Sequence, residues 1–208
     1  MNRFCKNCHY DYLEGEIIRE KENNILFFAD DKLDYIYQIN EGYVKMVRYL
    51  ENGDEKIIGI LGPGDYLALL AVLQKKTTYL ATAITLTKTT LKKIPEDQIW
   101  NAYQKNPDFR DRCLTCAVTR SNLFQNFLVQ SANLDVKERV MNTLKILFEK
   151  FGYRIGEKQV LDLPFSKTVL ANIIGIRRET LSRTITSLEQ ENILKNDKNR
   201  YLLKYKIL

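Results

Sequence analysis

The chain has 208 residues, 45% apolar and 28% charged, which is typical of a globular protein with one large domain or two small ones. No apolar run of about 18 residues occurs, which excludes a membrane-spanning helix. The N-terminal "MNRFCKNCHY" lacks the apolar block of a signal peptide, so we expect a cytoplasmic protein with reduced cysteines.

The net charge of +6 lies in the last third of the chain. Residues 1–132 hold 17 basic and 17 acidic side chains, whereas residues 133–208 hold 15 basic and 9 acidic ones. A basic module joined to a neutral one suggests a polyanion partner. Solvated surface lysines explain the same charge equally well.

Short apolar runs broken by turn residues fill the first half, from Ile17 to Ile94. "YVKMVRYL" alternates, "ENGDE" carries an Asn-Gly hairpin signal, and "KIIGIL" is the return strand. "GPGD" is another tight turn. Many short strands at close spacing predict an all-β roll or barrel.

Helical patterns begin at Pro95. "PEDQIWNAYQKN" predicts a short helix, and "PDFRDRCLTCAVTRSNLFQNFLVQSAN" predicts about seven turns without Gly or an interior Pro. The long helix has two adjacent apolar rows, so one row is expected to cover the roll and the other to meet a second subunit. The alternative is a single wide face that packs on the core. The rows are Phe109, Cys113, Cys116, Leu123 and Phe127, and Leu114, Ala117, Phe124 and Leu128.

The last third predicts a helix-turn-helix with a hairpin. "DVKERVMNTLKILFEKFG" is an amphipathic helix ended by Gly152, and "KQVLDLPF" is a short strand. Ser166 is expected to cap the next helix, and Gly175 permits a sharp turn before "IRRETLSRTITSLEQENIL". "ILKNDKNRYLLKYKIL" closes the chain as a hairpin.

The helix after Gly175 has two chemically different faces. Leu181, Ile185 and Leu188 fall on one side, and the other side is polar and comprises Glu179, Ser182, Arg183 and Thr186. In a helix-turn-helix the second helix enters the DNA major groove, where Arg binds guanine and Glu accepts from cytosine. Glu179 and Arg183 are four residues apart and are expected to orient each other. The alternative is a solvated face with one helical ion pair.

All four cysteines fall in two C-x-x-C pairs, Cys5 with Cys8 and Cys113 with Cys116. Four thiolates suit a tetrahedral zinc site or an iron–sulfur cluster, and two thiols suit a redox-active disulfide. His9, the one histidine, is a reserve ligand. Alternatively, Cys113 and Cys116 are small apolar residues packed along the long helix.

"IRRETLSRTITSLEQENIL", placed after "LANIIG", resembles the recognition helix of the cyclic-AMP receptor and fumarate–nitrate-reduction regulator (CRP/FNR) family of bacterial transcription factors. The resemblance covers almost the whole chain. It implies an α+β fold with an N-terminal β-roll of jelly-roll, cupin-like type over residues 1–106, a long dimerisation helix over 107–132 and a winged helix-turn-helix over 133–208.

The resemblance also implies partners and residue roles. The protein is expected to be a homodimer through the long helix, to bind palindromic double-stranded DNA with TGTGA- or TTGAT-like half-sites, and to contact RNA polymerase. Base-reading positions are Arg178, Glu179, Ser182 and Arg183; phosphate contacts are Ser166, Lys167, Arg177 and Thr186.

The roll departs from relatives that sense cyclic nucleotides. Those relatives carry a Gly-Glu pair and an Arg-Ser or Arg-Thr pair, where the Arg neutralises the phosphate. Here Ala68 and Leu69 occupy the first pair of positions, and Tyr79 and Leu80 the second. A buried phosphate needs a paired positive charge, so we expect no cyclic-AMP binding and a filled core, with an apolar ligand as the alternative.

The cysteines differ from the standard family cluster, which uses three N-terminal cysteines and one in the roll. This chain has two at the N-terminus, and Lys92 and Lys93 lie near the position of the roll cysteine. In this respect it is similar to FNR-like regulators of Gram-positive bacteria, which pair thiols of the N-terminus and the body in a disulfide.

Enzyme functions fit poorly. A catalytic cupin needs clustered His and carboxylate ligands, whereas this chain has one His. A C-x-x-C oxidoreductase needs a βαβ pattern, and none is present. A zinc-stapled or ligand-binding interaction protein without a cysteine switch remains the alternative to a DNA-binding regulator.

Overall fold

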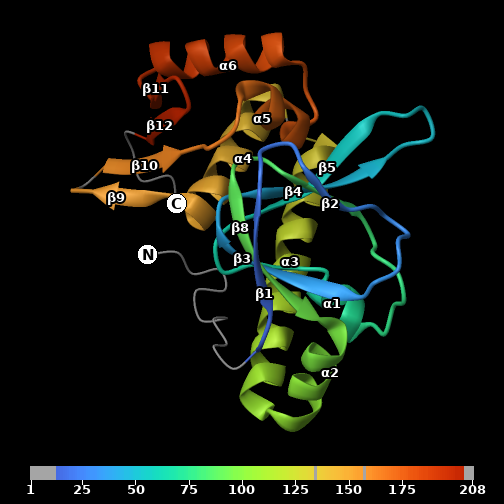
Figure 1. Cartoon of the computed structure of the whole chain (residues 1–208). Coiled ribbons are helices and arrows are strands. Elements are labelled where there is room, and N and C mark those ends of the chain that lie inside the picture. The colour runs from blue at the N-terminus through green and yellow to red at the C-terminus, as the bar shows by residue number, and fades with distance from the viewer. Residues whose placement is uncertain (1–12, 134, 157, 204–208) are drawn as a thin grey trace. The chain divides into compact units, whose positions relative to one another are not determined.

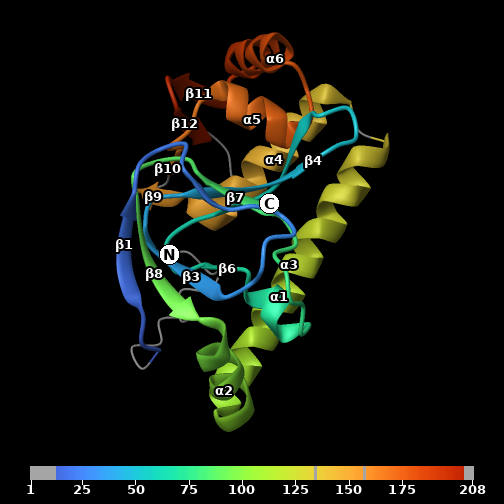
Figure 2. The same cartoon turned by 45° about the vertical axis from the view of Figure 1, so that its right-hand side comes forward.

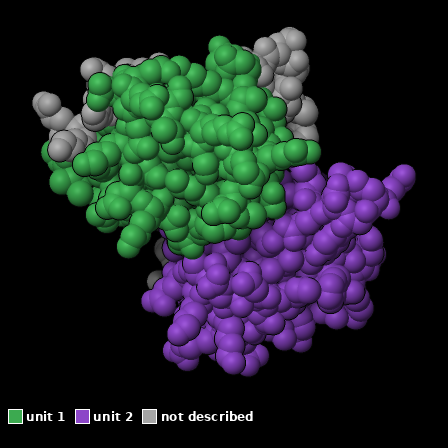
Figure 3. Space-filling view, turned by 90° about the horizontal axis from the view of Figure 1, so that it is seen from above, with its two compact units in different colours: residues 1–4, 121–208 green, residues 5–120 purple. Residues whose placement is uncertain are grey.

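A computed structural model describes residues 13–133, 135–156 and 158–203 of the chain (Figure 1). The side chains of residues 123, 124, 126–133 and 158 are outside this description. The described chain divides into two compact units, one ending at Arg120 and the other beginning at Ser121 (Figure 3). The division falls within the long helix, so each unit contains part of it.

The first unit is the predicted β-roll, built from two four-stranded antiparallel sheets. One sheet has the order β1 (Glu16–Glu20), β8 (Thr89–Pro95), β3 (Tyr35–Glu41), β6 (Tyr66–Leu67). The other has the order β2 (Ile25–Phe27), β7 (Thr82–Thr85), β4 (Val44–Tyr49), β5 (Glu55–Leu61). Burial is continuous in the central strands, from Ile36 to Ile39 of β3 and over all four residues of β7. The fully buried side chains of the roll include Ile36, Ile39, Val44, Leu91 and Ile94.

The turns lie where the sequence predicts them. Gly53, at the β4–β5 hairpin, has a φ of 83°, which is in the region that favours glycine. In "GPGD" the carboxylate of Asp65 accepts a hydrogen bond from the Gly62 N–H at 2.9 Å, and Gly64 has a φ of 88°. These local contacts set the register of the strands that follow.

Three helices pack on the roll: α1 (Leu69–Leu73), α2 (Glu96–Lys105) and the N-terminal part of α3 (Pro107–Asn133). Figures 1 and 2 show α2 beside the start of α3 at one end of the roll. Ile99 of α2 and Phe109 of α3 are buried in the core cluster. The Arg120 guanidinium donates to the carbonyl of Tyr66 at 2.9 Å, which ties α3 to β6.

The first half of α3 has two faces. Phe109, Cys113 and Cys116 are buried against the roll, whereas Leu114 is 63% exposed and Val118 is 50% exposed. A single wide face packed on the core is therefore wrong for this half. Leu123, Phe124, Phe127 and Leu128 of the predicted rows have side chains outside the described residues.

The second unit is the predicted winged helix-turn-helix. After α4 (Val136–Phe151), its sheet has the order β11 (Leu194–Asp197), β12 (Arg200–Leu203), β10 (Lys158–Asp162), β9 (Tyr153–Ile155). The helix-turn-helix is α5 (Lys167–Ile174) and α6 (Arg178–Gln190), and Figure 2 shows α5 between α4 and α6. None of the helices in the described ranges is long and apolar enough to cross a membrane.

Both ends of α4 have specific causes. Asp135 and Glu138 form a capping box at its start. Gly152 ends it as predicted, but with a φ of −74°, which any residue adopts. Glycine is needed there for space, because a Cβ would lie 2.5 Å from the carbonyl oxygen of Phe148.

Replacing Phe109 with Ala is expected to lower the free energy of unfolding of the roll by about 3–5 kcal/mol, because the ring is 1% exposed in the core. Urea unfolding followed by the fluorescence of Trp100, the one tryptophan, measures this. Arg110→Ala, at the exposed neighbouring position, is the control and changes the value by at most about 0.5 kcal/mol. Equal effects of the two substitutions contradict the packing of α3.

Candidate nucleic-acid interface

The two faces of α6 are separated as the sequence predicts. Leu181, Ile185 and Leu188 are at most 1% exposed. On the opposite side, Ser182 is half-buried, and the exposed residues are Arg178, Glu179, Arg183 and Thr186. Burial of one face therefore presents carboxylate, hydroxyl and guanidinium groups to the solvent side by side.

The charged groups on this face have no partners within the described part of the chain. Within the described residues, the side chains of Arg178, Glu179 and Arg183 form no hydrogen bond or ion pair. The four-residue spacing allows Glu179 and Arg183 to orient each other, but no ion pair joins them in the described structure. The donors and acceptors of these side chains consequently remain available to an external partner.

The turn before α6 is formed as predicted. Gly175 has a φ of 73°, and its N–H donates to the carbonyl of Ala171 at 2.8 Å. The Ile176 N–H donates to the same carbonyl at 3.0 Å. These bonds satisfy the carbonyl of Ala171 in the last turn of α5 and allow the chain to reverse direction within a few residues.

Two helix N-termini provide candidate phosphate contacts. The Ser166 hydroxyl accepts from the Val169 N–H at 3.4 Å, so its own proton remains free to donate. Lys167 follows at the first position of α5, and exposed Arg177 is the N-cap of α6 without a capping side chain. Backbone N–H groups and the positive end of the helix dipole favour anions at such positions.

Thr186 is less well prepared for a phosphate. Its hydroxyl donates to the carbonyl of Ser182 at 3.1 Å, so the proton is already used within the helix. To donate to a phosphate, the side chain has to rotate away from the backbone. A phosphate contact by Thr186 therefore stays a prediction, and it requires this rotation of the side chain.

The wing contains charged residues that the sequence reasoning did not single out. Arg200 donates to the carboxylate of Asp162 at 2.6 Å, and the Tyr153 hydroxyl donates to the same carboxylate at 2.6 Å. The Arg200 hydrogen bond lowers the pKa of Asp162. Exposed Lys198, at the β11–β12 turn with a φ of 56°, is a further candidate for a phosphate contact. The basic tip was visible in "NDKNR", but the pairing of Asp162 with Arg200 follows from strand register.

Comparison with known proteins identifies both units. Residues 18–106 match the cyclic nucleotide-binding domain family, and residues 138–206 match the Crp-like helix-turn-helix domain family. The chain belongs to the CRP/FNR family. It is a transcription regulator with a helix-turn-helix DNA-binding domain, and not an enzyme.

Similar proteins cover most of this CRP/FNR chain. The global nitrogen regulator of Nostoc sp. is 25% identical over 86% of this chain and 81% of its own length. The fumarate and nitrate reduction regulatory protein of Yersinia pestis is 26% identical over 92% of this chain and 77% of its own. The solved structure of FixK2 from Bradyrhizobium japonicum has the same fold, with a TM-score of 0.81, 17% identity, and coverage of 93% of this chain and 94% of that one.

The four positions of the roll that differ from relatives that sense cyclic nucleotides, Ala68, Leu69, Tyr79 and Leu80, carry no charged side chain. The ring of Tyr79 is 4% exposed and stacks on Phe27 with centroids 3.8 Å apart, and its hydroxyl donates to the carbonyl of Tyr35 at 2.8 Å. Burial raises the pKa of Tyr79 far above its usual value, so the group is neutral. Leu69 is buried as well, so none of these positions supplies the charge that a phosphate needs.

The backbone of the roll is nevertheless unusual at Ala68, which has a φ of 65°. A left-handed conformation favours glycine, which relatives that sense cyclic nucleotides have at this position. The left-handed turn is thus formed here by an alanine.

Two of the four cysteines lie in the described part. Cys113 and Cys116 are 3% and 4% exposed, and Cys113 belongs to the roll core. Within the described ranges no group of three or more His, Cys, Asp or Glu side chains is placed to hold a metal ion. Cys5, Cys8 and His9 are outside the described residues, so zinc, an iron–sulfur cluster and a disulfide all remain predictions.

Cyclic AMP is expected to give no heat in a calorimetric titration of the purified protein, because Ala68, Leu69, Tyr79 and Leu80 offer no cation to its phosphate. A response at micromolar concentration contradicts this assignment of Ala68, Leu69, Tyr79 and Leu80.

In the Cys5→Ser/Cys8→Ser variant, a thiol reagent is expected to modify no cysteine rapidly in the native protein and two after denaturation, because buried thiols are inaccessible. Adding Leu114→Cys, at the exposed position one residue from Cys113, is the control and should give one rapidly modified thiol. Rapid modification of two thiols in the native double variant would show that Cys113 and Cys116 are not buried.

Proposed function

We propose that this regulator binds DNA as a dimer and reads a palindrome of TGTGA- or TTGAT-like half-sites, with α6 in the major groove. Arg178, Glu179, Ser182 and Arg183 read base edges in this proposal. One observation carries it: the charged side chains of Arg178, Glu179 and Arg183 are exposed and unpaired within the described residues, opposite a row that is at most 1% exposed.

The residue types suit base reading. Arg donates two hydrogen bonds to guanine O6 and N7, and Glu accepts from the amino group of cytosine. Glu179 and Arg183 are four residues apart on one face of α6, so both reach into the same few base pairs. Ser182 bonds either way and adds contact without fixing one base.

Phosphate contacts by Ser166, Lys167, Arg177 and Thr186 hold α6 in register. They lie at the starts of α5 and α6 or farther along α6, around the base-reading face. Contacts to phosphates position a protein on the duplex and carry no sequence information directly. The excess positive charge of residues 133–208 supports this part of the proposal.

Dimerisation through α3 is supported by its second face. Leu114 and Val118 are four residues apart, and each has at least half of its surface exposed. Apolar side chains at this spacing form a seam for a second helix. A twofold dimer places two recognition helices about one DNA turn apart, and its surface loops then contact RNA polymerase.

Control through the cysteines would act on the same helix. Cys113 and Cys116 are on the face of α3 that packs on the roll. Forming a metal–thiolate or disulfide bond to the N-terminal pair therefore requires these thiols to leave the core. Such a change would shift α3 and with it the dimer seam, which is how sulfur chemistry would reach the DNA-binding units.

The Arg183→Ala variant is expected to lose about 1–3 kcal/mol of binding free energy at the best palindrome and to lose preference at one base pair. Fluorescence anisotropy with labelled duplexes that carry TGTGA or TTGAT half-sites, and with scrambled duplexes, measures both. The comparison is Lys167→Ala, which should weaken all duplexes alike and reduce the salt dependence.

If Arg183→Ala loses equal affinity for scrambled DNA, base reading by this residue is wrong. If the unmodified protein has no salt-dependent affinity for any duplex, an interaction protein without a DNA role is the better description.

A further inference from the structure

The first turn of α4 is bonded to the chain immediately before the recognition helix α6. The Nη2 atom of Arg139 donates to the carbonyl oxygen of Ile174 at 2.5 Å and to that of Gly175 at 3.3 Å. These carbonyls are at the C-terminal end of α5, where the helix dipole favours a cation. The bonds fix the turn from which α6 begins.

The same turn of α4 is also bonded to the far end of α6. The Lys137 Nζ donates to both carboxylate oxygens of Glu191, at 2.5 and 2.6 Å, and Glu191 is the C-cap of α6. The Ser187 hydroxyl donates to the same carboxylate at 3.0 Å. Hydrogen bonds from Lys137 and Ser187 lower the pKa of Glu191, so the carboxylate is charged at neutral pH.

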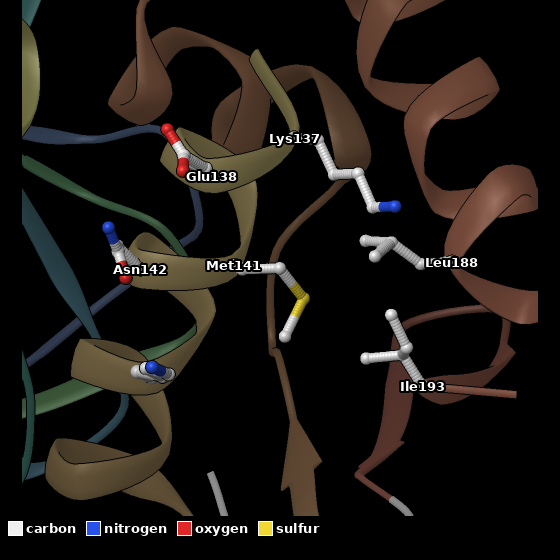
Figure 4. Close-up of a pocket in the computed structure, with 7 residues that line it drawn as sticks. Lys137, Glu138, Met141, Asn142, Leu188 and Ile193 are labelled. Atoms are coloured by element: carbon white, nitrogen blue, oxygen red, sulfur yellow. The ribbon is translucent and has the colours of Figure 1, made fainter. Parts of the chain in front are cut away.

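The surface between α4 and this end of α6 is hollowed, although Leu188 itself is fully buried. An open cavity of about 470 Å³ lies between them. Figure 4 shows Met141 of α4 facing Leu188 and Ile193 across the gap, with Lys137 at its edge. Close packing holds elements in one arrangement. Beside this gap, the polar bonds therefore contribute more to the angle between α6 and α4.

We infer that Lys137 and Arg139 are positioning residues for base reading, and we call this pair the α4 clamp. The clamp holds α6 at both ends, so that Glu179 and Arg183 meet the base edges at one fixed angle. Recognition geometry tolerates errors of only about 0.5 Å or 10–20°. The inference rests on the proposed function, since the clamp acts only through α6.

A charge-swap cycle tests the Lys137 half of the clamp. Lys137→Glu and Glu191→Lys each place like charges together, and the double variant restores an ion pair at unchanged net charge. The quantity measured is the ratio of affinities for the best palindrome and for a scrambled duplex at one salt concentration. Each single variant should lower this ratio about two- to fivefold, which corresponds to the free energy that an exposed ion pair contributes. The double variant should recover the ratio.

The control for charge is Lys150→Glu, which makes the same charge change in the last turn of α4. It should weaken binding to both duplexes alike and leave the ratio unchanged, because general attraction to DNA does not depend on sequence. A fall in the ratio in this variant equal to that in Lys137→Glu would assign the effect to charge and overturn the clamp.

Two substitutions test the Arg139 half. Arg139→Met keeps the length of the side chain and removes its donors, and should lower the ratio about tenfold. Arg139→Lys keeps one cationic donor group and should recover part of the loss. The melting temperature is measured alongside, because a role in stability alone would lower it and leave the ratio of the folded protein unchanged.

The outcomes separate the two proposals. Unmodified protein that binds both duplexes equally overturns the proposed function. Unmodified protein that discriminates, with unchanged ratios in the Arg139 variants or a double swap no better than the single ones, overturns the clamp. The swap cycle decides by itself if Arg139→Met does not fold.

Discussion

The burial of one apolar row of α6 is the constraint on which the DNA-binding surface depends. Leu181, Ile185 and Leu188 are at most 1% exposed, and their removal from water favours one rotation of the helix about its axis. Once that rotation is set, Glu179 and Arg183 have to face outward. The chemistry of the exposed face is thus decided by the packing of the opposite one.

A rotation about the axis does not fix the direction in which the axis points. The capped start of α5, the left-handed Gly175 and the two bonds of Arg139 set where α6 begins, and the Lys137–Glu191 pair holds its end. Each of these polar contacts is worth little alone. Together they restrict α6 at both ends, beside the open cavity at Met141.

In the β-roll, by contrast, the fold does not decide the chemistry of the side chains. Residues 18–106 match the cyclic nucleotide-binding domain family, yet Tyr79, at one of the positions that differ from relatives that sense cyclic nucleotides, is buried and stacked on Phe27. A fold therefore does not carry a ligand by itself. In the dimer proposed above, α3, with its buried thiols and exposed Leu114, is the element through which a signal would act.

Local sequence determined the elements and much of the candidate site. The Asn-Gly and Gly-Pro-Gly turns, the Ser166 cap, the Gly175 turn and the buried row of α6 could all be predicted, because each depends on residues close together in the chain. Whether Glu179 and Arg183 form an ion pair could not be predicted, since four-residue spacing brings two side chains within reach without requiring a bond. Only the tertiary structure brought Arg139 to the end of α5, Lys137 to Glu191 and Asp162 to Arg200. Those partners are 35 or more residues apart in the chain, and their pairing depends on how helices and strands pack, which no local pattern encodes.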